Sequence, residues 1–584
     1  MKKKIKQILN VKWKILFFEK LSKNISKFSL SEKIFFYIIC SILIVSGLTL
    51  LKKANESLMV DVPMNGGYLK EGIVGSPRFV NPVLAVSDVD HDLNSLIYSG
   101  LMKVSSNNLP EVDLADKYEI SEDGLEYTFT LKDNIYFHDG TSITTDDIDF
   151  TISKIQDTSI KSPKRPGFYD VKIEKIDNKT IKFILKKPYS PFLENLTIGI
   201  LPKHLWNNLS SEQFFLSLYN VEPIGSGPYK ISKMETLKKN MLLIPTYYEL
   251  TPFSKNSSGK PFIDKLIINF YGDEKTLIEA YNKGDIESIN SISIENIPSI
   301  KKQKESEIKT STLPRVFAIF FDENNSEILA NKEVRRALNI VVDREKIVND
   351  ILGGYGETLY GPIPSGLLNN NPKEEIAPDL ESAKDILTKE GWVKSTSTDT
   401  LVKKIDKNKK IELSISISTL NSPDLVKIAE YVKTDWEKLG VKVDIKQFEF
   451  GDLQQNIIRP RKFEALLYGE AIGRDMDFFA FWHSSQRNDP GLNISMYTNS
   501  KVDKLLEDAR KVQDINTREE KYIAFEKELK KDIPAVFLYS PSFIYITPNK
   551  IKGQEINTIT MPFERFINIS KWYIEINNLW KIFL

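Results

Sequence analysis

The chain has 584 residues, 41% of them hydrophobic, with 80 basic and 79 acidic side chains and a single cysteine. Residues 1–53 hold twelve lysines and two glutamates, which leaves 68 basic and 77 acidic side chains, a net charge of about −9, in residues 54–584. This acidic balance argues against a nucleic-acid partner, which requires a positive surface, and one cysteine excludes a disulfide within the chain.

The most apolar stretch is Ile34–Leu51, eighteen residues without a charge, bounded by Lys33 and by Lys52-Lys53. A run of this length is typical of a transmembrane helix, because about 20 residues cross the hydrocarbon layer. Ten lysines precede it against two glutamates, and positive flanks stay in the cytoplasm. The sequence therefore predicts a single-pass cell-membrane protein with a cytoplasmic N-terminus and its main domain in the periplasm or outside the cell. The predicted segments are a basic cytoplasmic segment (1–33), an anchor (34–51) and a linker (52–65).

Two other interpretations of this segment are less consistent with the residues. A cleaved signal peptide has an apolar core of about 7–15 residues that ends in small residues, whereas this run is longer and ends in Leu50-Leu51-Lys52-Lys53. A lipid-modified cysteine is not expected either, because Cys40 follows Ile39 in the middle of the run. The basic segment before the run either lies on the anionic inner leaflet or forms a disordered tail.

Local patterns in the first half predict two hairpins and two helices. A turn at Asp123-Gly124 and another at Asp177-Asn178 separate alternating segments. Thr144 or Thr145 is a suitable helix N-cap, with acids in the following turn. The predicted elements are hairpins over Tyr118–Leu131 and Asp170–Leu185, a helix from Thr144 to about Ile155, and a helix from Asp273 to a C-terminal cap at Gly284.

The second half alternates helices and strands, which favours a largely parallel α/β sheet. We expect helices over Lys332–Leu352, Leu380–Glu390, Asp424–Leu439, Lys501–Val512 and Thr517–Lys531, and strands over Ile411–Ser418, Val441–Phe448, Phe463–Tyr468 and Pro534–Tyr539. The pattern predicts two lobes, with the chain crossing between them near Pro314 and again near Pro534.

Signatures of catalysis and of cofactor binding are absent from the sequence. There is no P-loop, zinc-protease, nucleophile-elbow or dinucleotide motif. Gly225-Ser226-Gly227 resembles an elbow, but a strand-like segment follows it, so a tight turn is the better interpretation. The histidines, at positions 91, 138, 204 and 483, are too scattered to predict a metal site. We therefore expect no enzyme activity, no cofactor and no metal.

Several segments, in a fixed order, resemble one protein family. They include GGYLKEGIVGSPRFVNPVLA (66–85), LIYSGLMK (96–103), PIGSGPYK (223–230), VRRALNIVVDREKIV (334–348) and FEALLYGEAIGRDMDFFAFWHSSQ (463–486). Together they are similar to the extracellular solute-binding proteins of peptide ABC importers, the oligopeptide- and dipeptide-binding family (family 5), over residues 66–575.

The resemblance implies a fold and a set of partners. The fold is the large, three-domain type of periplasmic binding protein, α/β in class, here preceded by a transmembrane helix. The implied partners are a peptide, the permease and ATPase subunits of an ABC transporter, and the membrane, with a monomer outside the transporter. The implied domains are lobe 1 (66–311 and 535–584, with an inserted domain at about 105–215) and lobe 2 (312–534).

The family's peptide-binding members pair an aspartate, shortly after an aromatic strand, with the peptide's amino terminus. Here Tyr468-Gly469 is followed by Glu470, Asp475 and Asp477, and the first two acids are the best candidates. A buried ammonium requires a carboxylate partner because its desolvation is otherwise uncompensated. The alternative interpretation is that these acids form a solvated loop.

Three further residues are candidate ligand contacts. Trp482 follows the acidic segment, Tyr98 lies in the LIYSGL segment and Asn81 in PRFVNP. Each is also a common type of core residue, and that interpretation stays open.

The sequence therefore predicts a membrane-tethered binding protein that captures peptides and delivers them to an ABC transporter. The alternatives are the same fold binding a metal chelate, a sugar or an opine, and a cell-surface hydrolase, peptidase or sensory protein.

Overall fold

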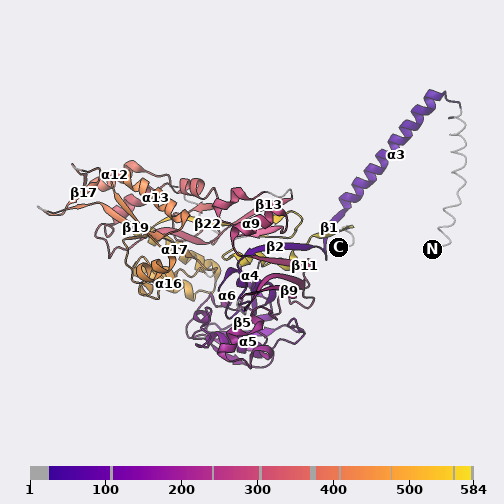
Figure 1. The fold of residues 1–584 in the computed structure, drawn as a ribbon, viewed down its shortest axis with the longest axis horizontal. Helices are drawn as coiled ribbons and strands as arrows, with labels where there is room; N and C mark the ends of the chain where they lie inside the picture. The colour runs from indigo at the N-terminus through magenta and orange to yellow at the C-terminus, as the bar shows by residue number, and fades with distance from the viewer. Residues whose placement is uncertain are drawn as a thin grey trace. The chain divides into compact units, whose positions relative to one another are not determined.

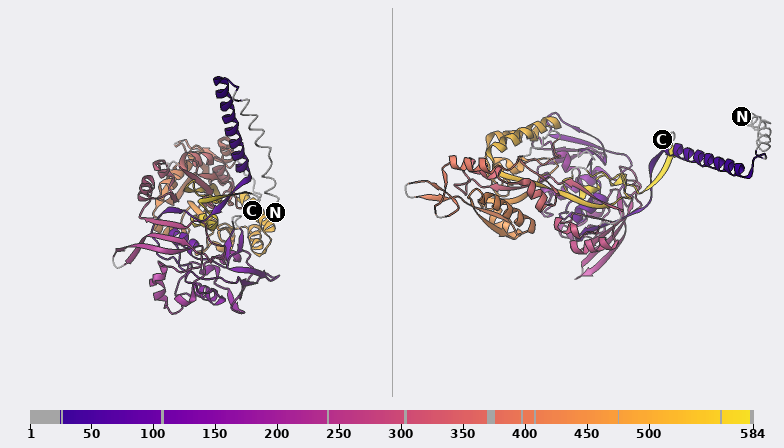
Figure 2. Two further views of the ribbon diagram at one scale, coloured as in Figure 1. Left: turned by 90° about the vertical axis from the view of Figure 1, so that its right-hand side faces the viewer. Right: turned by 90° about the horizontal axis from the view of Figure 1, so that it is seen from above.

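The computed structural model describes residues 25, 27–105, 109–239, 242–301, 305–368, 376–396, 398–406, 409–474, 476–556 and 559–580 (Figure 1, Figure 2). The chain divides into two units. The first contains the described residues up to Met64 together with Glu575–Trp580, and the second is Asn65–Ile574.

The first unit contains one long helix, α3 (Leu30–Leu58), which runs without a break (Figure 1). Its segment Leu30–Asn55 is long and apolar enough to cross a membrane, none of its most apolar window is buried, and no other helix in the described part of the chain is of this kind. The predicted linker 52–65 is helical as far as Leu58, because the first helix-breaking residue after the apolar run is Pro63.

A two-stranded ribbon follows the helix. Strand β1 (Met59–Met64) pairs antiparallel with β23 (Glu575–Trp580), with Met59 opposite Trp580 and Met64 opposite Glu575. Strand β23, which lies within the range 535–584 expected in lobe 1, thus pairs with the strand next to the helix.

The second unit is built on a sheet of twelve strands. Along one path their order is β20, β19, β21, β14, β22, β12, β2, β11, β10 and β9, and both β13 and β15 pair with β22. Among the described residues, parallel pairs join β2 to β11 and β12, and β19 to β20 and β21. The sheet is therefore mixed, and the prediction of a largely parallel sheet is wrong. The strands are β2 (Tyr68–Val74), β9 (Tyr229–Lys239), β10 (Leu242–Pro252), β11 (Lys265–Tyr271), β12 (Ser288–Asn290), β13 (Ser306–Thr312), β14 (Arg315–Phe321), β15 (Gly356–Thr358), β19 (Ser414–Leu420), β20 (Lys442–Phe448), β21 (Ala465–Ala471) and β22 (Ala535–Pro548).

Three smaller sheets accompany the large one. The four-stranded sheet has the order β5, β6, β8, β7 and contains both predicted hairpins. The remaining two are β3 with β4, and β16 with β17 and β18. Their strands are β3 (Met102–Val104), β4 (Pro110–Val112), β5 (Ala115–Ile120), β6 (Glu126–Leu131), β7 (Lys172–Lys175), β8 (Thr180–Ile184), β16 (Trp392–Lys394), β17 (Leu401–Lys404) and β18 (Lys410–Glu412).

The predicted helix start near Thr144 and the predicted helix from Asp273 to Gly284 agree with the structure, whereas the helix predicted from Thr517 begins at Ile515, after its cap Asp514. Thr144 forms a capping box with Asp147 at the start of α5, and Asp273 caps α9, which ends at Gly284 with a φ of 83°. Such caps satisfy backbone groups that the helix leaves unpaired. The helices are α4 (Asp88–Ile97), α5 (Thr145–Gln156), α6 (Phe192–Asn195), α7 (Lys203–Trp206), α8 (Ser211–Leu216), α9 (Glu274–Lys283), α10 (Lys332–Ile340), α11 (Arg344–Lys346), α12 (Leu380–Lys389), α13 (Pro423–Glu437), α14 (Phe450–Asp452), α15 (Phe479–Trp482), α16 (Ser500–Lys511) and α17 (Ile515–Asp532).

The single helix predicted over Lys332–Leu352 is divided. α10 ends at Ile340, and Asp343 adopts an extended conformation in which its side chain accepts a hydrogen bond from the Lys346 backbone. Aspartate favours such local hydrogen bonds over a helix interior, so a new helix begins at Arg344.

Buried apolar side chains form separate clusters in the two halves of this unit. The largest contains residues from Leu69 to Leu313 and from Phe543 to Trp572, and two others contain residues from Val316 to Tyr539. Strand β22 contributes to clusters of both kinds, and the change occurs between Tyr539 and Phe543.

A buried charge network links five elements of the first half. The Arg565 guanidinium is fully buried and donates to both carboxylate oxygens of Asp92 at 2.7 Å and to Glu71 at 3.1 Å. Glu71 accepts further hydrogen bonds from Tyr545 (2.8 Å), Asn290 (3.3 Å) and Ser288. The network therefore joins α4, β2, β12, β22 and the short turn Pro562–Phe566.

Candidate functional site

Two chain segments pass between the halves of the second unit, and they are hydrogen-bonded to each other. The Leu313 amide donates to the Pro541 carbonyl at 2.9 Å, and the Ser540 hydroxyl donates to the Leu313 carbonyl at 2.5 Å. Strand β21 ends beside this point, because Glu470 lies opposite Val316 and the Ile472 amide donates to the Pro314 carbonyl at 2.8 Å. The acidic segment found in the sequence therefore begins next to the crossing.

Glu470 is the acid with the least usual environment. The residue is 6% exposed, and its Oε2 atom has no hydrogen-bond partner among the described residues. Burial raises the pKa of the Glu470 carboxyl well above its usual range, because the charged form is poorly solvated there. A carboxylate in this setting gains stability from any cation that reaches it.

The side chain of Glu470 lies on the same face of β21 as Leu466 and Tyr468, since side chains alternate along a strand. This face packs on the cluster that contains Trp482 and Phe478. The opposite face has no side chain at Gly469, and a Cβ there would lie 2.7 Å from the Phe317 ring. The absence of a side chain at Gly469 leaves room for the ring of Phe317. This ring stacks on that of Tyr539, with 4.7 Å between the ring centres.

The Asp477 carboxylate forms an ion pair with Arg510. Arg510 donates to its two carboxylate oxygens at 2.8 and 2.5 Å, from Nε and Nη2, and the guanidinium also lies 3.6 Å from the centre of the Phe479 ring. A two-pronged pair of this kind is among the strong charge-assisted contacts. Asp477 is therefore a structural partner of α16, and Asp475 lies outside the described residues.

The other predicted contacts are embedded in the core. Trp482 is 1% exposed, between Phe320 and Phe537. The Tyr98 hydroxyl donates to the Val80 carbonyl at 3.4 Å, and burial raises the pKa of this phenol. Asn81 is fully buried; its amide donates to the Asn220 side chain at 3.1 Å and its oxygen accepts from the Val83 amide at 2.9 Å.

Contacts join the two halves on either side of the crossing. The Ser190 amide donates to the Arg510 carbonyl at 3.0 Å, Arg518 donates to the Ser190 hydroxyl at 2.8 Å, and Gln513 donates to the Tyr127 hydroxyl at 3.2 Å. These contacts connect the α16–α17 region to the segment predicted as an inserted domain, and none of them was readable from the sequence, because each partner lies more than 300 residues away.

A buried ion pair forms a second connection. Arg474, just after β21, pairs with Glu564, and both side chains are less than 10% exposed. Glu564 also accepts hydrogen bonds from the amide and the hydroxyl of Thr560, each at 2.5 Å. The loop that follows Glu470 is thereby attached to the first half.

The segment Gly225–Pro228 lies outside helices and strands, bends at Gly227 and Pro228, and leads directly into β9. A Cβ at Gly225 would lie 2.0 Å from the Ile97 carbonyl oxygen, so glycine is required for the close approach of two backbones. The Ser226 hydroxyl accepts a hydrogen bond from the Ser99 amide at 3.4 Å. Within the described ranges, no group of three or more His, Cys, Asp and Glu side chains is arranged to hold a metal ion.

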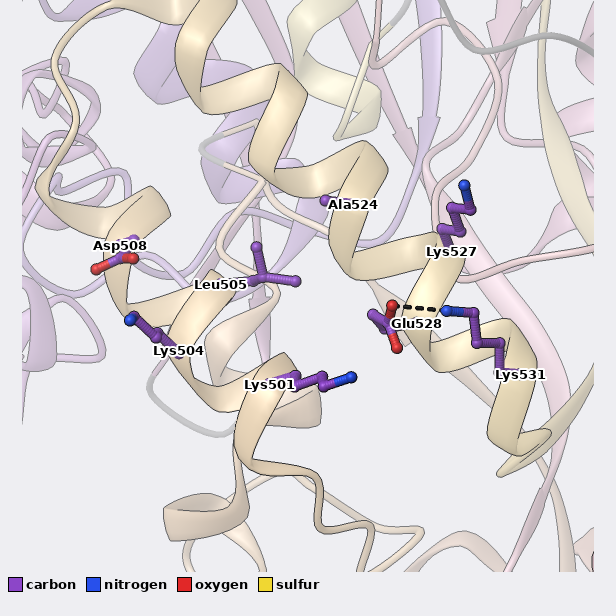
Figure 3. A pocket seen from close by; sticks show the side chains of 8 residues that line it. All are labelled: Lys501, Lys504, Leu505, Asp508, Ala524, Lys527, Glu528 and Lys531. Carbon is purple, nitrogen blue, oxygen red and sulfur yellow. Dashed lines mark hydrogen bonds and ion pairs between the residues drawn. The ribbon is translucent and has the colours of Figure 1, made fainter.

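A groove of about 440 Å³ lies between α16 and α17 (Figure 3). Lys501, Lys504, Lys527 and Lys531 are among the residues that line it, and Lys531 pairs with Glu528 at 2.7 Å (Figure 3). None of the residues predicted from the sequence as ligand contacts lines it. Its positive rim does not suit an ammonium group. The residues that line it are Lys501, Lys504, Leu505, Asp508, Ala524, Lys527, Glu528 and Lys531.

Comparisons with known proteins agree with this architecture. Residues 110–501 match the family model of bacterial extracellular solute-binding proteins, family 5 (middle). The oligopeptide-binding protein AppA of Bacillus subtilis is 29% identical over 523 residues, which cover 88% of this chain and 92% of the relative. Its structure with a nonapeptide has a TM-score of 0.66 at 27% identity, over 88% of this chain and 100% of that one.

Other solved structures with the same fold hold different molecules or come from other genera. NikZ of Campylobacter jejuni, solved with Ni(L-His), is 27% identical with a TM-score of 0.66, over 87% of this chain and 99% of that one. CtaP of Listeria monocytogenes, an ABC transporter substrate-binding protein, is 27% identical with a TM-score of 0.72, over 87% and 99% of the two chains. This chain belongs to family 5 of the bacterial extracellular solute-binding proteins.

Proposed function

We propose that this chain is a membrane-tethered binding protein that captures peptides outside the cytoplasm and delivers them to the permease and ATPase of an ABC transporter. The observation that carries the proposal is the buried Glu470 carboxylate, which lies beside the crossing strands without a partner among the described residues. The similarity to AppA, whose structure holds a nonapeptide, supports peptides as the solute. The protein works without covalent chemistry, as a monomer outside the transporter.

The Glu470 carboxylate receives the amino terminus of the peptide in this account. An ammonium group that enters a closed site loses its hydration and is stabilised only by a negative partner. The peptide backbone itself needs hydrogen bonds that do not depend on its side chains, which strand edges provide. Asp475, five positions after Glu470 in the sequence, is the second acid proposed.

Closure of two lobes on the ligand is the mechanism. We propose residues 66–311 (with the inserted domain at about 105–215) and 541–574 as lobe 1, and residues 312–540 as lobe 2, so that the return crossing lies a few residues after the boundary at 535 expected from the sequence. The separate apolar clusters support this division. A peptide that contacts both lobes shifts the population toward the closed form, which the transporter recognises.

The Arg474–Glu564 pair provides a test of closure. We propose that the Arg474–Glu564 pair, which joins the two halves, forms on closure. In residues 54–584, Arg474→Met is then expected to weaken peptide binding by about 30-fold or more, because closure would bury Glu564 without its arginine. Small-angle scattering is expected to show a smaller radius of gyration when a mixed peptide library is added to the wild type, and a smaller change in the variant.

The matched control is Arg459→Met, since the Arg459 side chain is 55% exposed and lies 3.8 Å from Asp489. This variant is expected to bind and close as the wild type does. Unchanged scattering of the wild type despite measurable binding contradicts the closure mechanism.

The anchor is tested on the intact protein in cells. We expect it to stay in the membrane fraction after salt and alkaline washing, because the run Ile34–Leu51 carries no charge. External protease is expected to degrade residues 54–584 and to spare the basic N-terminal segment. A shorter soluble form that starts near residue 50 overturns the anchor.

A further inference from the structure

The ribbon of β1 and β23 is wholly apolar at the end next to α3 and carries one charged side chain at the other end. At the end next to α3, Met59 lies opposite Trp580 and Val60 opposite Leu579, so all four residues are apolar. At the far end Met64 lies opposite Glu575 and Pro63 opposite Ile576, so a charged side chain interrupts the apolar ones there. An isolated two-stranded ribbon is marginally stable in water, so an apolar end of this kind is expected to rest on another surface.

Trp580 is fixed to the helix that precedes the ribbon. Its indole N–H donates to the Asn55 side-chain oxygen at 2.9 Å, and Asn55 is in α3. The tryptophan is nevertheless 44% exposed. Leu58, the last residue of α3 before β1, is also exposed, at 51%.

The depth of Trp580 follows from the helix geometry. The uncharged run ends at Leu51, and Asn55 lies four residues later, about 6 Å along the axis at roughly 1.5 Å per residue. The polar layer on each side of a bilayer is about 5–8 Å thick. The Trp580 indole, hydrogen-bonded to Asn55, is therefore at the depth of the lipid headgroups.

We propose that the ribbon is a second membrane contact, in which the Trp580 indole and the apolar end of β1–β23 lie in the headgroup layer of the extracytoplasmic leaflet. Tryptophan favours this layer because its ring is apolar and its N–H is polar. The surface is continuous with the membrane that holds α3, which selects lipid as the occupant. Both ends of Asn65–Ile574 are thereby connected to the membrane through the ribbon. The inference rests on the anchor proposed above and is independent of the ligand.

The test uses the full chain in phosphatidylcholine–phosphatidylglycerol vesicles, with lipids brominated near the top of the acyl chain as quenchers of tryptophan fluorescence. The difference between wild type and Trp580→Phe isolates the signal of this indole. We expect that signal to be emitted at shorter wavelength than in water and to be lost with brominated lipid. The matched control is Asn577→Trp in the Trp580→Phe background, where the indole lies three residues farther along the same strand and is expected to stay unquenched.

The outcomes separate the two proposals. If the protein fails to float with the vesicles, the anchor itself is wrong. If it floats and the Trp580 signal is unquenched, the ribbon does not contact lipid and this inference alone is overturned. Equal quenching at positions 577 and 580 also overturns it, because the ribbon then lies flat and the assigned depth is wrong. Peptide binding is unaffected in every case.

Discussion

Arg565→Met is expected to destabilise the protein by about 3–5 kcal/mol, the usual effect of removing one partner from a buried ion pair. The variant leaves the carboxylates of Glu71 and Asp92 buried without their cation. It also removes a guanidinium that lies 4.0 Å from the centre of the Phe566 ring. Urea unfolding of residues 54–584 measures the change.

The matched control for this prediction is Arg336→Met. The Arg336 side chain is 56% exposed and lies 3.4 Å from Glu333 on the same helix, and exposed pairs of this kind contribute about 0–1 kcal/mol. Equal loss of stability in the two variants contradicts the role of the Arg565 network. A double variant that also replaces Asp92 by Asn is expected to recover part of the loss, because one uncompensated charge is removed.

Glu470→Gln is expected to lower the affinity for free peptides by about 10²-fold or more, since it leaves the peptide ammonium without a negative partner. N-acetylated peptides are expected to bind the wild type poorly and to lose little further affinity in the variant. Calorimetry with both peptides and both proteins forms a double-mutant cycle.

The control acid is Asp444, an exposed residue of β20, and Asp444→Asn is expected to leave binding unchanged. If the losses of binding free energy from Glu470→Gln and from N-acetylation are additive, Glu470 does not contact the peptide's amino terminus. Asp475 is then the acid to test. Thermal melts accompany the titrations, because Glu470→Gln is expected to keep the ligand-free protein at least as stable as the wild type near neutral pH.

The pH dependence of stability follows from the same group. The pKa of Glu470 is raised in the folded protein by burial, so the folded state binds a proton more tightly than the unfolded chain does. Protonation of Glu470 therefore stabilises the folded protein at low pH. This stabilisation is lost as the pH rises from the pKa that Glu470 has in the unfolded chain to its higher pKa in the folded protein. Melting curves of the wild type over that window are expected to show this loss, and those of Glu470→Gln to lack it.

Local features of the fold were predictable because their determinants are close in sequence. The Thr144 and Asp147 capping box, and the Asp273 and Gly284 ends of α9, are each defined within a few residues. The hairpin turns are equally local. The division of the helix at Asp343 was missed because a single side chain, with a suitable partner at Lys346, outweighs the helical pattern around it.

Partners that lie far apart in the sequence could not be predicted. Nothing in the neighbourhood of Asp477 shows that Arg510 will neutralise it, so this acid was grouped with Glu470. Arg565 contacts Glu71 across 494 positions, and β23 pairs with β1 across a similar span. The sequence indicated the acidic segment after Tyr468, whereas the burial that distinguishes Glu470 from Asp477 depends on the complete tertiary structure.

The most direct test of the proposed function is mass spectrometry of the molecules that co-purify with residues 54–584. The account predicts short peptides with free amino termini, released on denaturation and displaced by an added peptide library. A different solute, such as a nickel–histidine complex, or the absence of any ligand together with no heat of binding for peptides, contradicts it.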